Sequence, residues 1–456
     1  MNFLDENYYA RWLDTDSLLK NNSIGVIDNT SSVETIGLPI GSINDKIIVD
    51  KNIDSTIVIG DIGSGKTQST ILPMLEQASL SNESIFVVDP DNTLYLNTSK
   101  KFENNGFKVI NINLKNLDVS NNWNPFYIVS KLYNNGKEDD AYRLLNTSLS
   151  YLLAETNKNA DPFWANTASQ YLTGIILSLI EKNVDIEKIN FKTLTKFTTE
   201  YTNEDVVEYL DNLDKSSVAY KNIASTYLAP FDTKGSIMSV LNQKLTEIIG
   251  RKKLVSILAR NDFDITNIRK EKSIIYLTYD CTNIIDCSLC NILLEQLFYV
   301  VSNDEIKNPY TFLIDDFDSN QKPIINFNNK LSGLRRVYAQ AVLFVRGFEL
   351  LNRVYDKEDV EILKYQCNNI LYLISKEYST LDFISNFCGK KNETDNLVST
   401  EALRRMPMWS AIYIKSRIMP YFGKLVPYYT MNIENIPNEY HKNSIQDVEV
   451  INLENI

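Results

Sequence analysis

The stretch Gly60-Asp61-Ile62-Gly63-Ser64-Gly65-Lys66-Thr67 has the residue spacing of a phosphate-binding loop. In such a loop the glycines let the backbone curl, so that successive N–H groups point at phosphate oxygens. Lys66 adds a positive charge at the β- and γ-phosphates, and the Thr67 hydroxyl is a ligand for Mg²⁺. The predicted ligand is ATP with Mg²⁺, and the predicted binding residues are Gly60, Gly63, Ser64, Gly65, Lys66, Thr67 and Gln68.

The segments on both sides of this loop have the character that a P-loop requires. Ser55–Ile59 is β-branched and predicts a strand, and Gln68–Gln77 predicts a helix, in which Pro73 is an unfavourable residue. Short apolar runs then alternate with helical stretches, which predicts an α/β fold with a mostly parallel sheet. The predicted strands are Ser55–Gly60, Ser84–Asp89, Lys108–Asn113, Ser273–Tyr279, Tyr310–Asp315, Ala341–Val345, Ile370–Ser375 and Ala411–Lys415.

The alternation stops between Pro125 and about Thr233, where long amphipathic stretches predict an inserted all-α domain. Its clearest helices are expected over Tyr142–Glu155, Trp164–Lys182 and Asn203–Leu213. The predicted boundaries are a lead-in over residues 1–39, a nucleotide-binding domain over 40–125 and 235–430, an all-α domain over 126–234, and an acidic tail over 431–456.

A second signal is a run of apolar residues that ends in two acids, Tyr310–Phe317. P-loop ATPases need a carboxylate at the end of a neighbouring strand to organise Mg²⁺ and the attacking water. We predict that Asp315 binds the metal shell and that Asp316 occupies the position of the general base. Asp89, at the end of another apolar run, is either a competing metal ligand or a turn cap before Pro90; the second interpretation is favoured.

Composition limits the remaining functions. The net charge of −12 argues against nucleic-acid binding over the whole surface, so any such site must be local. Local basic clusters with aromatic neighbours at Tyr338 and Trp409 are candidates for contacts with single-stranded DNA or for solvated helix ends. These clusters are Arg251-Lys252-Lys253, Arg335-Arg336 and Arg404-Arg405. The sequence has neither a signal peptide nor an apolar run as long as a membrane span, so we expect a cytoplasmic protein.

The five cysteines are too few and too scattered for a disulfide framework. Cys287 and Cys290 have the CxxC spacing of a zinc or redox site, but the chain has a single histidine and no second CxxC. We therefore expect buried thiols at both positions.

The order of several motifs along the chain resembles that of type IV secretion coupling proteins, the TraG/TraD-type ATPases of bacterial conjugation. The segments that carry this resemblance are Gly60–Thr67, Val88–Tyr95, Asn121–Phe126, Asp161–Trp164, Thr233–Ile237, Phe312–Phe317, Asn352–Tyr355 and Leu403–Pro407, with Ala10–Trp12 as a lead-in.

The resemblance implies a RecA-like motor domain that carries an all-α domain and forms a homo-hexameric ring. It also implies a function: ATP is used to recruit and deliver a relaxase–DNA substrate to the transfer channel. The implied partners are single-stranded DNA, relaxase and relaxosome proteins, and channel components. The family's N-terminal membrane anchor has no counterpart here, so we expect placement at the inner face of the cell membrane through partners, including a separate membrane subunit.

Departures from the family pattern leave other functions open. The family has Asp-Glu where this chain has Asp315-Asp316, and a glutamine where this chain has Arg346. A base that is one methylene shorter predicts weakened hydrolysis. Arg346 is a candidate γ-phosphate sensor, and Arg335 and Arg336 are candidate arginine fingers. The alternatives are a nucleotide-dependent interaction module with little or no hydrolysis and a soluble DNA translocase of the same superfamily.

Overall fold

The computed structural model describes residues 9–28, 33–52, 54–154, 161–305, 308–431, 433 and 447–453. The chain forms two compact units. The first consists of Met1–Val109, Ile268–Tyr276 and Asp304–Glu439, and the second of Ile110–Asn267, Leu277–Asn303 and Tyr440–Ile456. The domain boundaries predicted above stay predictions, and most of the predicted tail lies outside the described residues.

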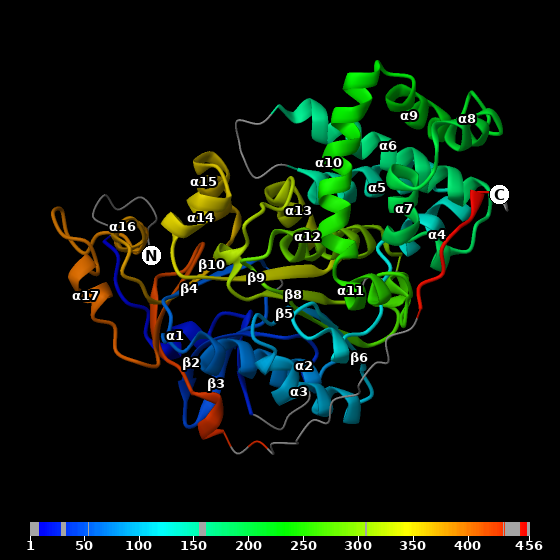
Figure 1. Ribbon diagram of the computed structural model, residues 1–456. Coiled ribbons are helices and arrows are strands. Elements are labelled where there is room, and N and C mark those ends of the chain that lie inside the picture. The colour runs from blue at the N-terminus through cyan, green and yellow to red at the C-terminus, as the bar shows by residue number, and fades with distance from the viewer. Residues whose placement is uncertain are drawn as a thin grey trace. The chain divides into compact units, whose positions relative to one another are not determined.

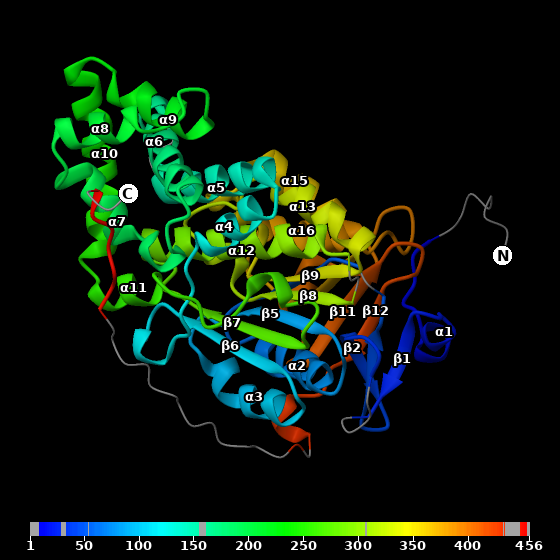
Figure 2. The same ribbon diagram turned by 90° about the vertical axis from the view of Figure 1, so that its right-hand side faces the viewer.

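A nine-stranded sheet with the order β12-β11-β10-β4-β9-β8-β5-β7-β6 forms the framework (Figures 1 and 2). Neighbours in the run β10-β4-β9-β8-β5 are parallel, and β11 and β12 are antiparallel at one edge. All eight predicted strands are confirmed. The strands are β4 (Thr56–Gly60), β5 (Ser84–Val88), β6 (Lys108–Asn113), β7 (Ser273–Thr278), β8 (Tyr310–Ile314), β9 (Ala339–Val345), β10 (Asn369–Ile374), β11 (Ser410–Lys415) and β12 (Tyr421–Lys424).

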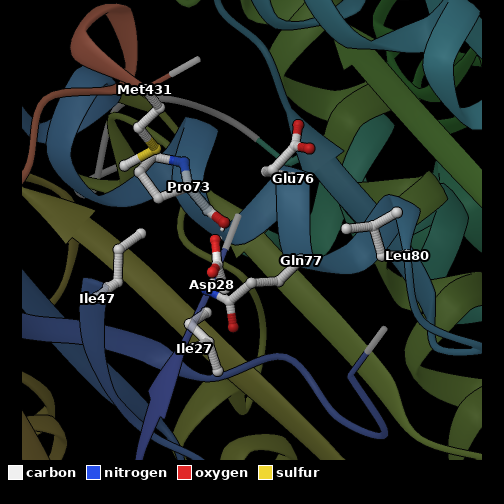
Figure 3. A pocket seen from close by; sticks show the side chains of 8 residues that line it. All are labelled: Ile27, Asp28, Ile47, Pro73, Glu76, Gln77, Leu80 and Met431. Carbon is white, nitrogen blue, oxygen red and sulfur yellow. Dashed lines mark hydrogen bonds between the residues drawn. The ribbon is translucent and has the colours of Figure 1, made fainter. Parts of the chain in front are cut away.

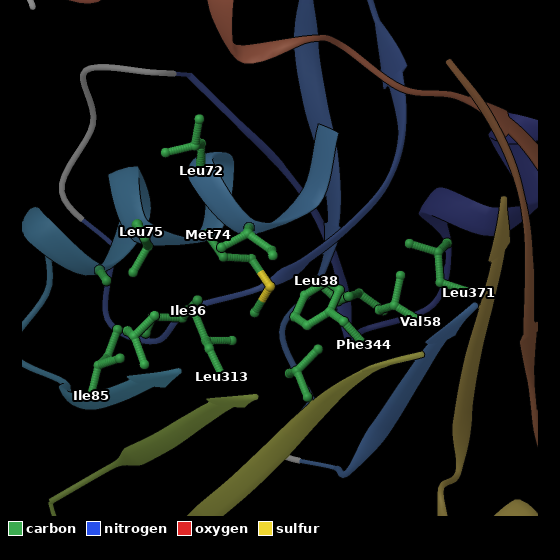
Figure 4. Packing of buried hydrophobic residues seen from close by; sticks show 14 of the residues in the cluster. Ile36, Leu38, Val58, Leu72, Met74, Leu75, Ile85, Leu313, Phe344 and Leu371 are labelled. Carbon is green, nitrogen blue, oxygen red and sulfur yellow. The ribbon is translucent and has the colours of Figure 1, made fainter. Parts of the chain in front are cut away.

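The central strands β4, β5 and β8 are buried along their whole length, as expected for parallel strands that are covered on both faces. Helices α2 (Leu72–Ser79) and α3 (Thr93–Asn104) lie on one face. On the other face lie α13 (Phe327–Leu334), α14 (Phe348–Val354) and α15 (Lys357–Gln366). Figure 4 shows how Met74 and Leu75 of α2 pack toward residues of the sheet. This core fixes the helix that follows the P-loop onto the strand that precedes it.

The predicted helix Gln68–Gln77 is two elements in the structure. A π-helical turn, η1 (Thr67–Ile71), precedes α2, and the Leu72 N–H donates to the Thr67 carbonyl. Pro73 lies in the first turn of α2, directly after the π-helical turn. The residue that is unfavourable inside one continuous helix therefore lies at the junction of two elements.

A small antiparallel sheet of order β1-β3-β2 was not predicted. It consists of β1 (Ile24–Ile27), β2 (Leu38–Ile43) and β3 (Lys46–Asp50), and α1 (Thr15–Leu19) precedes it. The turn between β2 and β3 is Asn44-Asp45, with both residues at positive φ (48° and 59°). This geometry is that of a two-residue hairpin turn, so the Asn-Asp pair was the sequence signal that could have revealed the hairpin.

The second unit is mainly helical. Its helices are α4 (Tyr127–Asn134), α5 (Glu138–Leu153), α6 (Pro162–Glu181), α7 (Phe191–Thr199), α8 (Asn203–Asp211), α9 (Val218–Tyr227), α10 (Phe231–Ile249), α11 (Lys252–Ile257) and α12 (Ile284–Asn303). Helix α6 approaches α9 closely at Gly174, where a Cβ would lie 2.7 Å from Ile223. Residues 447–453 pack on this unit, where the Tyr201 hydroxyl donates to the Ile451 carbonyl at 2.9 Å. The three helices predicted here are confirmed.

Helix α12 is, within the described residues, the one helix with the length and apolar composition needed to cross a membrane. Of its most apolar 18-residue window, 83% is buried inside the protein, as in a core helix. Cys287 and Cys290 lie in this helix and are buried, and among the described residues no group of three or more His, Cys, Asp or Glu side chains is arranged to hold a metal. Both thiols are therefore part of the packing.

Candidate functional site

The loop between β4 and η1 can be formed only with glycine at several positions. Gly63 and Gly65 have φ values of +78° and +90°, a region that side chains disfavour. At Gly60, a Cβ would lie 2.4 Å from the Ser64 hydroxyl oxygen. The predicted strand–loop–helix arrangement is therefore present, and its tight curvature explains the glycine spacing.

Lys66 lies inside this loop and is 8% exposed. Its Nζ donates to the main-chain carbonyl oxygens of Gly60, at 2.5 Å, and Asp61, at 3.4 Å. The ammonium group is thus held at the mouth of the loop by backbone dipoles.

Four buried polar atoms in and around the loop have no hydrogen-bond partner among the described residues. They are Asp61 Oδ2, Ser64 Oγ, Gln68 Oε1 and Asp89 Oδ1. Burying a polar atom without a partner is unfavourable, so such atoms are rare in folded proteins. At this loop, the four atoms fit a site that receives a polar ligand such as a phosphate chain with its metal ion.

Asp315 and Asp316 follow β8 and reach the same edge of the sheet, with β9 between β8 and the P-loop strand β4. The Asp316 N–H donates to Asp315 Oδ1 at 3.0 Å, and Asp316 has a left-handed backbone with a φ of +47°. Burial raises the pKa of Asp315 to about 7, with a further increase from Asp316 and an opposing effect of Lys66. Asp315 therefore lies within electrostatic reach of both Asp316 and Lys66.

Asp89 lies at the end of β5, the strand next to β8. Its Oδ2 accepts the Tyr95 N–H at 2.8 Å, so the carboxylate caps the first turn of α3. Burial raises the pKa of Asp89 to about 6, against the effect of this hydrogen bond. Asp89 Oδ2 therefore acts as a cap, whereas Asp89 Oδ1 has no hydrogen-bond partner among the described residues.

Arg346 follows β9, directly beside the loop, but its charge is paired with Asp318. The Arg346 Nε lies 3.2 Å from Asp318 Oδ1, and the main-chain N–H of Arg346 donates to Asp318 Oδ2 at 2.7 Å. A third bond runs from the guanidinium to the Ser319 hydroxyl at 2.9 Å. Burial raises the pKa of Asp318, and Arg346 opposes this shift. The guanidinium is thus held by the segment after β8.

Arg335 and Arg336 lie in η6 (Arg335–Val337), which precedes β9. Arg335 pairs with Asp54 at 3.4 Å, and Asp54 comes just before β4. Because β4 and β9 are parallel, these amino ends lie at the edge of the sheet opposite to the P-loop. The two arginines are therefore not brought to the P-loop of their own chain.

Trp123 and Asn124, which lie in one of the segments that carry the family resemblance, make structural contacts within the helical unit. The Asn124 side-chain amide, 1% exposed, donates to the carbonyls of Ile186, Ile189 and Ala259. The Trp123 indole donates to Gln296 at 3.1 Å. This segment fixes the first turn of the helical unit and is separate from the P-loop chemistry.

A small cavity lies beside α2, away from the loop glycines (Figure 3). It is lined by Ile27, Asp28, Ile47, Pro73, Glu76, Gln77, Leu80 and Met431. The Glu76 carboxylate is already engaged by Lys101 and by the Tyr428 hydroxyl. This cavity therefore has mostly apolar walls and adds nothing to the phosphate site.

Sequence reasoning missed one neighbour of the loop. Trp409 was considered only as a stacking residue beside Arg404-Arg405, yet its ring lies against Gly65. No local signal could have shown this contact, because it depends on how β11 lies in the sheet.

Two features define a P-loop NTPase fold: a strand–loop–helix with a buried lysine, and acids at the end of β8, which is separated from β4 by one strand. Residues 12–410 match the family described as type IV secretory system conjugative DNA transfer. The chain belongs to this family of conjugative coupling proteins.

Solved structures show the same fold. The plasmid coupling protein TrwB in complex with the ATP analogue ADPNP has a TM-score of 0.68 at 13% identity, covering 96% of this chain and 97% of TrwB. TrwB with ADP and Mg²⁺ has a TM-score of 0.66 at 13% identity, covering 92% and 94%. VirB4 of Thermoanaerobacter pseudethanolicus has a TM-score of 0.52 at 11% identity, covering 88% and 99%. No curated protein matches the sequence.

Proposed function

We propose that this chain is an ATP-binding coupling protein of a conjugative type IV secretion system, which uses ATP to recruit and deliver a relaxase–DNA substrate to the transfer channel. The observation that carries the proposal is the convergence of Lys66, Asp315 and Asp316 on one edge of the sheet within a chain of this family. The solved TrwB complexes with ADPNP and with ADP and Mg²⁺ support nucleotide binding.

The residues would divide the work as follows. The loop N–H groups and Lys66 bind the phosphates, and Thr67 and Asp315 would hold Mg²⁺. Bound Mg²⁺ would neutralise charge on the β- and γ-phosphates during transfer. Asp316 would accept the proton of the attacking water from its place next to Asp315. Its carboxylate is one methylene shorter than glutamate, and a displacement of about 1 Å can lower the rate by about a hundredfold.

The second candidate is an interaction module that binds ATP and turns it over slowly or not at all. Asp316 and the pairing of Arg346 with Asp318 favour it, since both remove groups that would act on the γ-phosphate. A soluble DNA translocase of the same superfamily is less favoured, because the chain is acidic overall (net charge −12).

The proposal extends to assembly and location. In a homo-hexamer, Arg335 and Arg336 would reach the nucleotide of a neighbouring subunit, since they lie at the edge opposite to their own P-loop. The 68% exposure of the Arg335 side chain fits this role. Single-stranded DNA, relaxosome proteins and channel components are the proposed partners. The chain would work in the cytoplasm at the inner face of the cell membrane, through these partners or a separate membrane subunit.

The test is steady-state ATP hydrolysis by the purified protein, with and without single-stranded DNA, beside Lys66→Ala and Asp316→Glu. Lys46→Ala, which changes an exposed lysine, is the matched control. Hydrolysis that DNA stimulates and that Lys66→Ala alone abolishes establishes a motor. Wild-type protein that binds ATP but turns it over no faster than Lys66→Ala, with hydrolysis restored by Asp316→Glu, establishes the interaction module instead.

A further inference from the structure

The indole ring of Trp409 lies directly against the P-loop. A Cβ placed on Gly65 would lie 2.6 Å from Trp409 Cζ3 and 3.1 Å from Cε3, so the six-membered ring faces the Gly65 Cα. Trp409 immediately precedes β11, and the structure leaves its side chain half-buried. Part of the ring is therefore open beside the loop that would hold the phosphates.

The backbone of Trp409 has a strained geometry that aims the ring at this place. Its φ is +61°, in the left-handed region that a bulky side chain disfavours. The Trp409 carbonyl accepts the Leu425 N–H at 2.7 Å, which ties the residue to the segment after β12. Strain of this kind persists where the surrounding structure imposes it, and it is frequent at ligand sites.

A second aromatic ring stands beside Trp409. The Tyr429 ring centroid lies 5.9 Å away with an interplanar angle of 69°, an edge-to-face arrangement. Tyr429 is 66% exposed, so most of its ring is open to a ligand. The two rings form an aromatic wall with one open side.

The sheet order shows which end of a nucleotide this wall would meet. Asp315 follows β8, two strands from β4 on one side, and Trp409 precedes β11, two strands from β4 on the other. Strands are about 4.8 Å apart, so each lies about 10 Å from the P-loop strand. With the γ-phosphate and its metal toward Asp315, the base of the same nucleotide extends toward β10 and β11.

We propose that Trp409 and Tyr429 form the wall against which the base of the bound nucleotide stacks. The inference rests on nucleotide binding at the P-loop, as proposed above. Stacking on an aromatic face adds affinity without reading the identity of the base, because every base has a π-face. The site should therefore bind ATP and GTP with similar affinity.

The test compares nucleotides with inorganic tripolyphosphate, which has the phosphates but no base. Trp409→Asn removes the ring while keeping a residue type that tolerates a left-handed backbone. Trp409→Phe is the matched variant that keeps a ring, and Tyr429→Ala removes the exposed ring. Affinities for ATP, GTP and tripolyphosphate are measured by calorimetry on the full chain with Mg²⁺ present.

We expect Trp409→Asn to weaken ATP and GTP binding alike, by about tenfold, with tripolyphosphate binding unchanged. Tyr429→Ala should give a smaller loss of the same kind, and Trp409→Phe should keep most of the affinity. Equal losses for nucleotides and tripolyphosphate would show that Trp409 only supports the loop, and unchanged affinities would show no contact; either result overturns the stacking proposal.

Two further outcomes separate this inference from the proposed function. Wild-type protein that binds neither ATP nor tripolyphosphate refutes nucleotide binding itself. Trp409→Asn protein that keeps its ATP affinity but loses affinity for a single-stranded oligonucleotide shows that the rings stack on nucleic acid, which also overturns the inference.

Discussion

Glu83 should make the stability of the protein fall as pH rises. Its carboxylate is 2% exposed at the start of β5, where it accepts the Ile36 N–H at 2.9 Å and the Thr311 hydroxyl. Burial raises the pKa of Glu83 from 4.5 to about 7, against the effect of both hydrogen bonds. The neutral acid is therefore favoured in the folded protein over a pH range in which the unfolded chain carries the charge.

The size of the effect follows from the two pKa values. Below pH 4.5 the group is protonated in both states, so its full relative contribution to stability is present. As pH rises through 4.5 toward 7, only the unfolded state releases the proton, and the free energy of unfolding falls. With 1.36 kcal/mol for each pKa unit, the loss between pH 5 and pH 8 is about 2.5 kcal/mol.

The assay is urea unfolding of wild type and Glu83→Gln at several pH values from 5 to 8. Other acids with raised pKa values, Asp89 among them, contribute to the slope in both proteins, so the difference between the two curves isolates Glu83. From pH 5 to pH 8, we expect the free energy of unfolding of wild type to fall by about 2.5 kcal/mol relative to that of Glu83→Gln. Glu34→Gln is the same substitution at an exposed position, and its free energy of unfolding should depend on pH as that of wild type does. Parallel curves for wild type and Glu83→Gln would refute the reasoning.

Three further experiments test separate parts of the structure. Gly63→Ala adds only backbone strain of about 1–2 kcal/mol, because nothing lies within 4 Å of its Cβ, whereas Gly65→Ala adds a clash as well; urea unfolding should show the larger loss at Gly65. Arg346→Met leaves a buried carboxylate unpaired and should lower the free energy of unfolding by about 3 kcal/mol, of which Asp318→Asn in the same chain should recover part. Thr202→Ala removes one half of the capping box of α8 and should lower stability by about 1 kcal/mol, with amide exchange increasing at the start of α8 and unchanged in the sheet.

The central strands could be predicted from the sequence because each is a continuous apolar run that ends in polar residues. The apolar runs of β4 and β8 indicate both the sheet and the site, because the P-loop directly follows β4 and the two acids directly follow β8. Local signals of this kind need no knowledge of the tertiary structure.

The elements that were missed depend on contacts between distant segments. In β12 only alternate residues are buried, and Gly423 is required there because a Cβ would lie 2.1 Å from the Ile40 carbonyl oxygen. The placement of Trp409 against Gly65 and the pairing of Arg346 with Asp318 are of the same type. Each joins residues that lie on or next to different strands, so the order of strands had to be known first.

The structure also gives a physical reason for the aspartate at position 316. Its backbone is left-handed, with a φ of +47°, and aspartate is enriched in that region whereas glutamate is not. The following loop is tied to the end of β9 by the Arg346–Asp318 pair, which limits how far the backbone at position 316 can relax. The two departures from the family pattern therefore lie on one short segment after β8, with Asp316 two residues before the partner of Arg346.

This arrangement decides which variant should be used to test ATP hydrolysis. Replacing Arg346 by glutamine would leave the Asp318 carboxylate unpaired and would confound activity with stability. Asp316→Glu alone keeps that pair and adds a strain of about 1–2 kcal/mol in the left-handed region, so its free energy of unfolding is measured beside its activity. A gain of hydrolysis in this variant would therefore report the reach of the carboxylate itself, because the surrounding loop stays fastened to β9.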